Sequence, residues 1–61
     1  MRVLFQMRKG YTTSAGIRIK KGDFISITGT ADHAYIVEIL RVEREVLVPL
    51  NEFNRFAERI S

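Results

Sequence analysis

Hydrophobic and polar residues alternate with a period of two over much of the first half of this chain. Residues 2–7, 17–20 and 24–28 each carry apolar side chains at every second position, and residues 11–13 are also β-prone. This period is typical of a strand that buries one face. Short glycine-containing segments separate the runs, as turns do. The pattern therefore predicts three short strands and one further β-prone segment.

Two more strands are expected before the pattern changes. Residues 34–42 alternate imperfectly, with apolar side chains on both sides, and residues 46–48 form a short apolar run that Pro49 stops. The polar segment 29–33 has the right length for a hairpin loop. The charged segment 43–45 is expected to be the next turn.

The spacing of apolar residues changes to three and four at the end of the sequence. Apolar side chains recur there at four positions: Leu50, Phe53, Phe56 and Ile60. This spacing predicts an amphipathic helix over about residues 50–60. Asn51 is the expected N-cap, because its side-chain oxygen can accept a free amide of the first turn. A helix this short is not stable alone in water. Its apolar face is therefore expected to pack against the rest of the protein.

The length of the chain limits the possible architecture. Sixty-one residues make one domain, over residues 1–61, near the lower limit at which a chain buries a sufficient core. There is no cysteine, so disulfides and thiolate metal sites are excluded. Closing five short strands into a barrel removes exposed sheet edges. We therefore predict an all-β, five-stranded small barrel with a short C-terminal helix.

No segment of the sequence predicts membrane insertion or export. The first residues carry one positive charge but lack the long apolar run of a signal peptide. The longest uninterrupted apolar stretch, residues 46–50, is far too short to span a bilayer. We expect a soluble, cytoplasmic protein with no membrane partner.

Positive charge is concentrated in the first third of the chain. Residues 1–22 contain six lysines and arginines and no acidic residue, whereas residues 23–61 contain seven acidic residues and four arginines. The local charges are +6 and −3, within a net charge of +3. Such asymmetry indicates an anionic partner.

The basic residues are expected to share one exposed surface. If the apolar residues of strands 2–7 and 17–20 point inward, the cations between them point outward, with lysines at the turns. Clustered cations bind phosphates by releasing condensed counterions, and a tyrosine can stack on an unpaired base. We therefore predict a site for DNA or RNA formed by Arg2, Arg8, Lys9, Tyr11, Arg18, Lys20 and Lys21. The other interpretation is that these cations only keep an exposed strand soluble and unpaired.

Residues 17–27 read Ile-Arg-Ile-Lys-Lys-Gly-Asp-Phe-Ile-Ser-Ile. In the middle of this stretch, Gly22 can adopt the positive φ of a tight turn. The stretch resembles the segment apolar-x-apolar-Lys-Lys-Gly-Asp-x-Ile-x-Val of SH3-like barrels, and residues 45–53 are similar to the strand, proline and helical turn of those barrels. The resemblance implies an SH3-like fold. The chain has no tryptophan, so the aromatic groove that holds proline-rich peptides is not implied.

A weaker likeness is to the plasmid-borne type II dihydrofolate reductases. These SH3-like chains also end in a proline followed by a short apolar tail. Their pore strand reads Val-Gln-Ile-Tyr, where this chain has Val-Leu-Val-Pro at residues 46–49. Because the glutamine and the tyrosine are absent, the likeness does not imply the reductase activity.

Candidate catalytic residues are sparse. The only histidine, His33, follows Asp32 in the polar loop and is interpreted as a solvated turn residue. No serine has a triad-like pattern, and the glycines form no phosphate-binding fingerprint. We expect no catalytic residue, metal site or cofactor, and therefore a non-enzymatic binding module.

A protein-interaction module is the alternative. The interior of one small barrel cannot hold every apolar side chain among Leu4, Tyr35, Ile36 and Leu40. The surplus can form an interface with a protein partner or a homo-oligomer. Small phage or plasmid accessory proteins, inhibitors among them, often act in this way. The acidic second part of the chain also favours this alternative over nucleic-acid binding.

Overall fold

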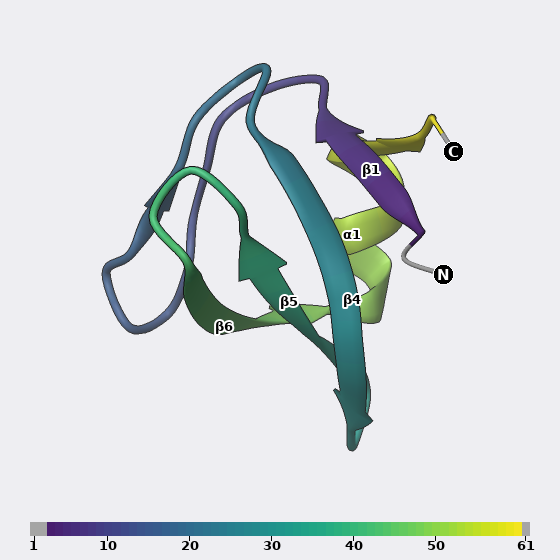
Figure 1. Ribbon diagram of the computed structural model, residues 1–61. Helices are drawn as coiled ribbons and strands as arrows, with labels where there is room; N and C mark the ends of the chain where they lie inside the picture. The colour runs from purple at the N-terminus through teal and green to yellow at the C-terminus, as the bar shows by residue number, and fades with distance from the viewer. Residues whose placement is uncertain (1–2, 61) are drawn as a thin grey trace.

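The structure, a computed structural model, describes residues 3–60 (Figure 1). The elements in chain order are β1 (Leu4–Met7), β2 (Tyr11–Thr12), β3 (Arg18–Ile19), β4 (Phe24–Ala31), β5 (Ala34–Ile39), β6 (Arg44–Pro49), α1 (Leu50–Phe56) and β7 (Ala57–Arg59). The prediction of a mostly β chain with one short helix late in the sequence is confirmed. The described helix is too short to cross a membrane.

Five strands form one antiparallel sheet in the order β6-β5-β4-β1-β7, while β2 and β3 pair in a separate ribbon. Within residues 3–60 the sheet has two ends, because β6 and β7 do not pair with each other. The hydrogen-bonded ring of a closed barrel is therefore not seen. The strands curl around a common interior, with α1 behind β4 and the β2–β3 ribbon on the left in Figure 1.

The core contains apolar side chains from most of these elements. Its buried residues are Met7, Ile19, Ile25, Val37, Ile39, Val46, Val48, Phe53 and Phe56. The alternation in the first half of the sequence correctly placed Met7 and Ile19 inside. Phe5 and Ile17 are partly buried against the same core, but Val3 is 36% exposed.

The predicted loop at residues 29–33 is mostly strand. β4 continues to Ala31, which pairs with Ala34, so the hairpin turn contains only Asp32 and His33. The pairing of β4 with β5 shifts register between Ile27 and Gly29, as it does at a β-bulge. Glycine suits this position because a β-carbon on Gly29 would lie 3.3 Å from Cδ1 of Ile36.

The next turn also lies earlier than predicted. The strand expected over residues 34–42 ends at Ile39, and the chain turns at residues 40–43. Arg44 and Glu45, expected in a turn, belong to β6, where they pair with Ile39 and Glu38. The longer β6 gives β5 a partner along its whole length.

The helix is shorter than predicted. It ends at Phe56, and residues 57–59 form β7, which pairs with β1. The Arg8 amide, just after β1, donates to the Phe56 carbonyl at 2.6 Å. The chain therefore begins to pair with the β1 segment where the helix ends. Ile60, expected on the docked helix face, is 45% exposed.

The helix begins at Leu50, as predicted, but its N-cap differs from the prediction. Asn51 is not the N-cap; Pro49 occupies that position and no side chain caps the helix. The Leu50 amide instead donates to the His33 carbonyl at 3.0 Å, so the β4–β5 turn satisfies one free amide. The expected docking of Phe53 is confirmed, because its buried ring lies edge-on to the rings of Phe5 and Tyr35. The distances between ring centroids are 4.9 Å and 5.0 Å.

Candidate nucleic-acid interface

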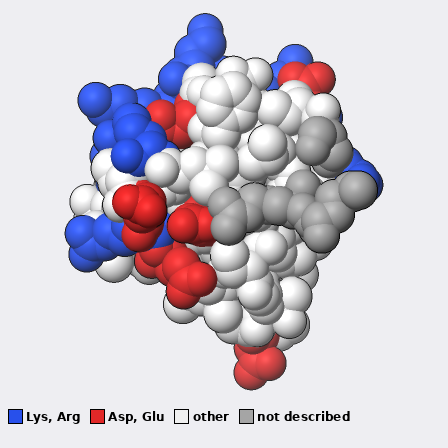
Figure 2. Space-filling view, in the orientation of Figure 1, with Lys and Arg blue, Asp and Glu red and all other residues white. Residues whose placement is uncertain are grey.

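Two backbone hydrogen bonds bring the basic segments of the first half together. The Met7 amide donates to the Asp23 carbonyl at 2.9 Å, and the Gly22 amide donates to the Met7 carbonyl at 2.8 Å. These bonds hold the turn at residues 20–23 beside the end of β1, where Arg8 and Lys9 follow. Figure 2 shows basic side chains along the top and left of the molecule, with acidic side chains gathered below those on the left.

The β2–β3 ribbon directs Arg18 outward. Tyr11 pairs with Ile19, whose side chain is buried, and Thr12 pairs with Arg18 on the exposed side. Nη1 of Arg18 donates to Oγ1 of Thr12 at 3.4 Å. A β-carbon on Gly10 would lie 2.8 Å from Nη2 of Arg18, so the guanidinium group extends across this glycine.

Asp23 fixes the turn that carries Lys20 and Lys21. Its Oδ2 accepts the Lys20 amide at 2.9 Å, and Gly22 has a φ of +90°. Arg41 donates to the same carboxylate from Nε at 3.0 Å and from Nη2 at 3.1 Å. The hydrogen bonds from Arg41 are the largest cause of a lowered Asp23 pKa. The acid nearest to the two lysines is therefore already paired.

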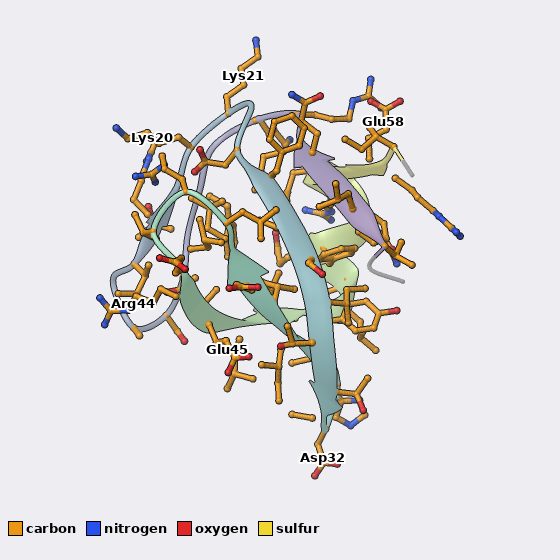
Figure 3. The ribbon with its side chains drawn as sticks, in the orientation of Figure 1. Lys20, Lys21, Asp32, Arg44, Glu45 and Glu58 are labelled. Atoms are coloured by element: carbon orange, nitrogen blue, oxygen red, sulfur yellow. The ribbon has the colours of Figure 1, made fainter. Side chains whose placement is uncertain are left out.

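We call Lys9, Arg18, Lys20 and Lys21 the basic rim. All four side chains are exposed, and none forms an ion pair within residues 3–60. Lys20 and Lys21 point away from the body of the molecule in Figure 3. Unpaired cations this close together produce a positive potential that attracts phosphates.

Arg8 lies near the basic rim but has a partner. Its Nε is 4.0 Å from Oε1 of Glu58 on β7, and both side chains are largely exposed. Exposed pairs of this kind are weak and are screened by salt. Arg8 can therefore turn toward an anion with little loss of stability.

The remaining two predicted site residues are Arg2 and Tyr11. Arg2 lies outside the described residues. Tyr11 is half-buried, and its ring stacks on Phe56 at a centroid distance of 4.6 Å. The tyrosine thus fastens the ribbon to the core, and one face of its ring is covered.

The sequence prediction did not include Phe24. This residue begins β4 directly after the turn at residues 20–23, and its side chain is 44% exposed. The alternation that buries Ile25 also directs Phe24 to the opposite, outward side. The same pattern in the sequence could have identified it.

Asp23 and Glu58 lie close to the basic rim, but other acidic groups lie farther from it. Glu38 and Glu45 are paired neighbours on β5 and β6. In Figure 3, Glu45 and Asp32 extend from the lower part of the molecule, whereas Lys20 and Lys21 extend from the upper part. Within residues 3–60, no three potential metal ligands are placed to hold an ion.

A second surface feature is a groove of about 400 Å³ beside β6. The loop at residues 13–17 forms one wall, and residues 44–47 form the other. Three hydrogen bonds within that loop hold it, including Oγ1 of Thr13 with the Ile17 amide at 3.1 Å. Leu47 in the opposite wall is 54% exposed. The groove therefore presents apolar surface beside an end strand of the sheet.

Comparisons of the chain with protein-family models, with curated proteins and with solved structures give no significant match. What the protein binds must therefore be inferred from its own surface. The basic rim, the exposed ring of Phe24 and the groove beside β6 are the features from which to infer it.

Proposed function

We propose that this protein is a small, non-enzymatic module that binds nucleic acid through the basic rim. The observation that supports it is the presence of four exposed cations that form no ion pair within residues 3–60, next to an aspartate that Arg41 already pairs. Cations arranged in this way bind a phosphate backbone by displacing its counterions. Asp23 orders the turn that carries two of them, and its strongest interaction is with Arg41.

Recognition through these residues is largely independent of sequence. Lysine and arginine contacts to phosphates position a nucleic acid but do not identify its bases. Both DNA and RNA supply such phosphates. The proposed ligand class is therefore defined by its backbone.

We also propose that the fold is an SH3-like small barrel. Its support is the antiparallel succession of β4, β5 and β6 together with a final strand, β7, that returns beside β1. The resemblance of residues 17–27 to the turn segment of such barrels agrees with this order. Small barrels carry many unrelated functions, so the fold adds nothing to the choice of ligand.

The double substitution Arg18→Gln/Lys20→Gln tests the proposed function. We expect about tenfold weaker binding of a labelled DNA or RNA oligonucleotide at low salt, because the variant cannot neutralise two of the phosphates. Arg44→Gln/Arg55→Gln is the matched control, since it also removes two positive charges, from exposed residues outside the basic rim. Equal affinity of wild type and rim variant, or no binding of either nucleic acid by the wild type, would refute the proposal.

The groove beside β6 favours a second candidate function, binding of a protein segment. β6 is an end strand, and an extended segment can pair with such an edge while apolar side chains contact Leu47. A pull-down from nuclease-treated lysate with wild type and Leu47→Glu tests this candidate. A partner that the wild type retains and the variant loses supports it, whereas identical profiles exclude it. Light scattering of the same two proteins shows whether the segment belongs to a second copy of this chain.

A further inference from the structure

Phe24 differs from every other aromatic residue in the described part of the chain. The remaining rings pack against each other in three pairs: Phe5 with Phe53, Tyr35 with Phe53, and Tyr11 with Phe56. Phe24 makes no such ring contact within residues 3–60, and 44% of its surface is exposed. Its exposure is similar to that of Val42 and Ile60, but within residues 3–60 it is the one aromatic side chain that packs against no other ring.

The backbone under this ring is held on both sides. Phe24 pairs with Gln6 of β1, and its carbonyl accepts the Leu40 amide at 3.1 Å. The Gln6 side chain reaches the preceding turn, where Nε2 donates to the Gly22 carbonyl at 3.3 Å. The ring therefore stands at a defined position on the outer side of the sheet.

That position adjoins the basic rim. Lys20 and Lys21 precede Phe24 by four and three residues, in the turn that Asp23 and Arg41 hold in place. A nucleic-acid strand whose phosphates contact these lysines can reach the ring with its bases, because Phe24 follows Lys21 by only three residues. Aromatic rings beside a positively charged path are the usual means by which proteins hold unpaired bases.

We infer that the ring of Phe24 is a stacking platform for a base and that the nucleic acid bound by this protein is single-stranded. The inference rests on the proposed function, because the basic rim has to hold the phosphates of the strand. Bases in a duplex are paired and stacked on each other, so they do not reach the ring, whereas bases of a single strand do. Every base can stack on an aromatic ring, so stacking requires no particular nucleotide sequence. This agrees with a protein surface whose other contacts are to the phosphates of the nucleic acid.

Phe24→Trp gives a direct reading of stacking. The chain contains no tryptophan, so the substitution introduces a single indole. We expect an oligothymidylate of about twelve nucleotides, a length within the usual site sizes, to quench its emission. Inorganic polyphosphate, which supplies phosphates without bases, should compete for the basic rim and leave the emission unchanged.

Phe24→Leu separates stacking from apolar contact. We expect this variant to bind oligothymidylate about tenfold more weakly than the wild type, since stacking on one base contributes about that factor. Its affinity for polyphosphate should not change. Leu47→Ala is the control, because it truncates another exposed apolar residue, 54% exposed, outside the basic rim.

The outcomes distinguish the inference from the proposed function. Salt-dependent binding of oligothymidylate with equal affinity for wild type and Phe24→Leu would overturn the stacking role and leave the proposed function standing. So would an introduced indole whose emission the bound strand does not change. Tighter binding of a duplex than of a single strand would overturn the single-strand preference. If neither nucleic acid binds the wild type at low salt, the proposed function fails and the inference fails with it.

Discussion

Asp23 orders the basic turn, while its strongest interaction is with Arg41 rather than with the lysines of the turn. Its carboxylate accepts the Lys20 amide, which fixes the turn, and it is also held by two nitrogens of Arg41. The positive charge that balances Asp23 thus comes from the β5–β6 turn, eighteen residues away in sequence. Lys20 and Lys21 are left available for an external anion.

Replacing this carboxylate makes the stability of the protein less sensitive to acid. The folded pKa of Asp23 is lowered, chiefly by Arg41, so its contribution to stability is complete above the ordinary range of a carboxyl group. That contribution is lost as the pH falls below about 4 toward the folded pKa. We expect Asp23→Asn to be about 1 kcal/mol less stable at pH 7, because Arg41 is partly exposed and the ion pair is screened.

Urea unfolding of wild type and Asp23→Asn between neutral and acidic pH measures this difference. The gap between the two proteins should narrow as the pH falls. Asp32→Asn, in the exposed β4–β5 turn, removes a charge that forms no ion pair within residues 3–60 and is the control. A gap that stays constant from neutral pH to acid would show that Arg41 does not depress the pKa of Asp23.

At the scale of elements, α1 holds the molecule together through Phe53. Its side chain is 2% exposed and contacts the rings of Phe5 on β1 and Tyr35 on β5. The helix thereby joins two strands of the sheet that are not neighbours. A helix of seven residues has no stability of its own, so this docking is what keeps it formed.

Phe53→Ala should abolish cooperative folding. Removing a buried phenylalanine side chain costs about 3 to 5 kcal/mol, which is comparable to the whole stability of so small a domain. Thermal melting followed by circular dichroism should show no sigmoidal transition. Leu50→Ala, in the same helix at a position 37% exposed, should melt within a few degrees of the wild type. A normal transition in Phe53→Ala would mean that α1 is not required for the fold.

The strands of this fold were largely predictable from the sequence, but several of their ends were not. The alternation around Ile19 and Ile25 specifies strands directly, because each buries one face. Residues 57–60 continue the apolar spacing of α1, yet the edge of β1 offers backbone hydrogen bonds that a longer helix would leave unmade. Gly29 was expected in a loop, since no local pattern reveals the register shift after which it pairs with Ile36 of β5.

At the scale of the whole molecule, the distribution of charge along the sequence becomes a distribution in space. The domain measures 24 × 22 × 22 Å, so its opposite ends are only a few side-chain lengths apart. One ion pair joins the two segments, Arg8 of the basic segment with Glu58 of the acidic one, whereas Asp23 and Arg41 pair within the acidic segment. The four cations of the basic rim form no such pair in the part of the chain that the structure describes.

The candidate site was only partly readable from the sequence. The number of cations can be read directly from the sequence. Their outward direction follows from the local alternation of apolar and polar residues. The choice of which cations remain unpaired depends on contacts between distant segments, such as Arg8 with Glu58, that no local pattern reveals. The covered ring of Tyr11 likewise depends on tertiary packing, because Phe56 of α1 lies against it.

The dependence of nucleic-acid affinity on salt tests the role of the basic rim most directly. The logarithm of the binding constant should fall linearly with the logarithm of salt concentration. Arg18→Gln/Lys20→Gln should reduce the slope by about two, one for each phosphate that the variant no longer neutralises. Arg44→Gln/Arg55→Gln should keep the slope of the wild type. A slope near zero for the wild type, or the same slope in the wild type and the rim variant, would contradict phosphate binding by the basic rim.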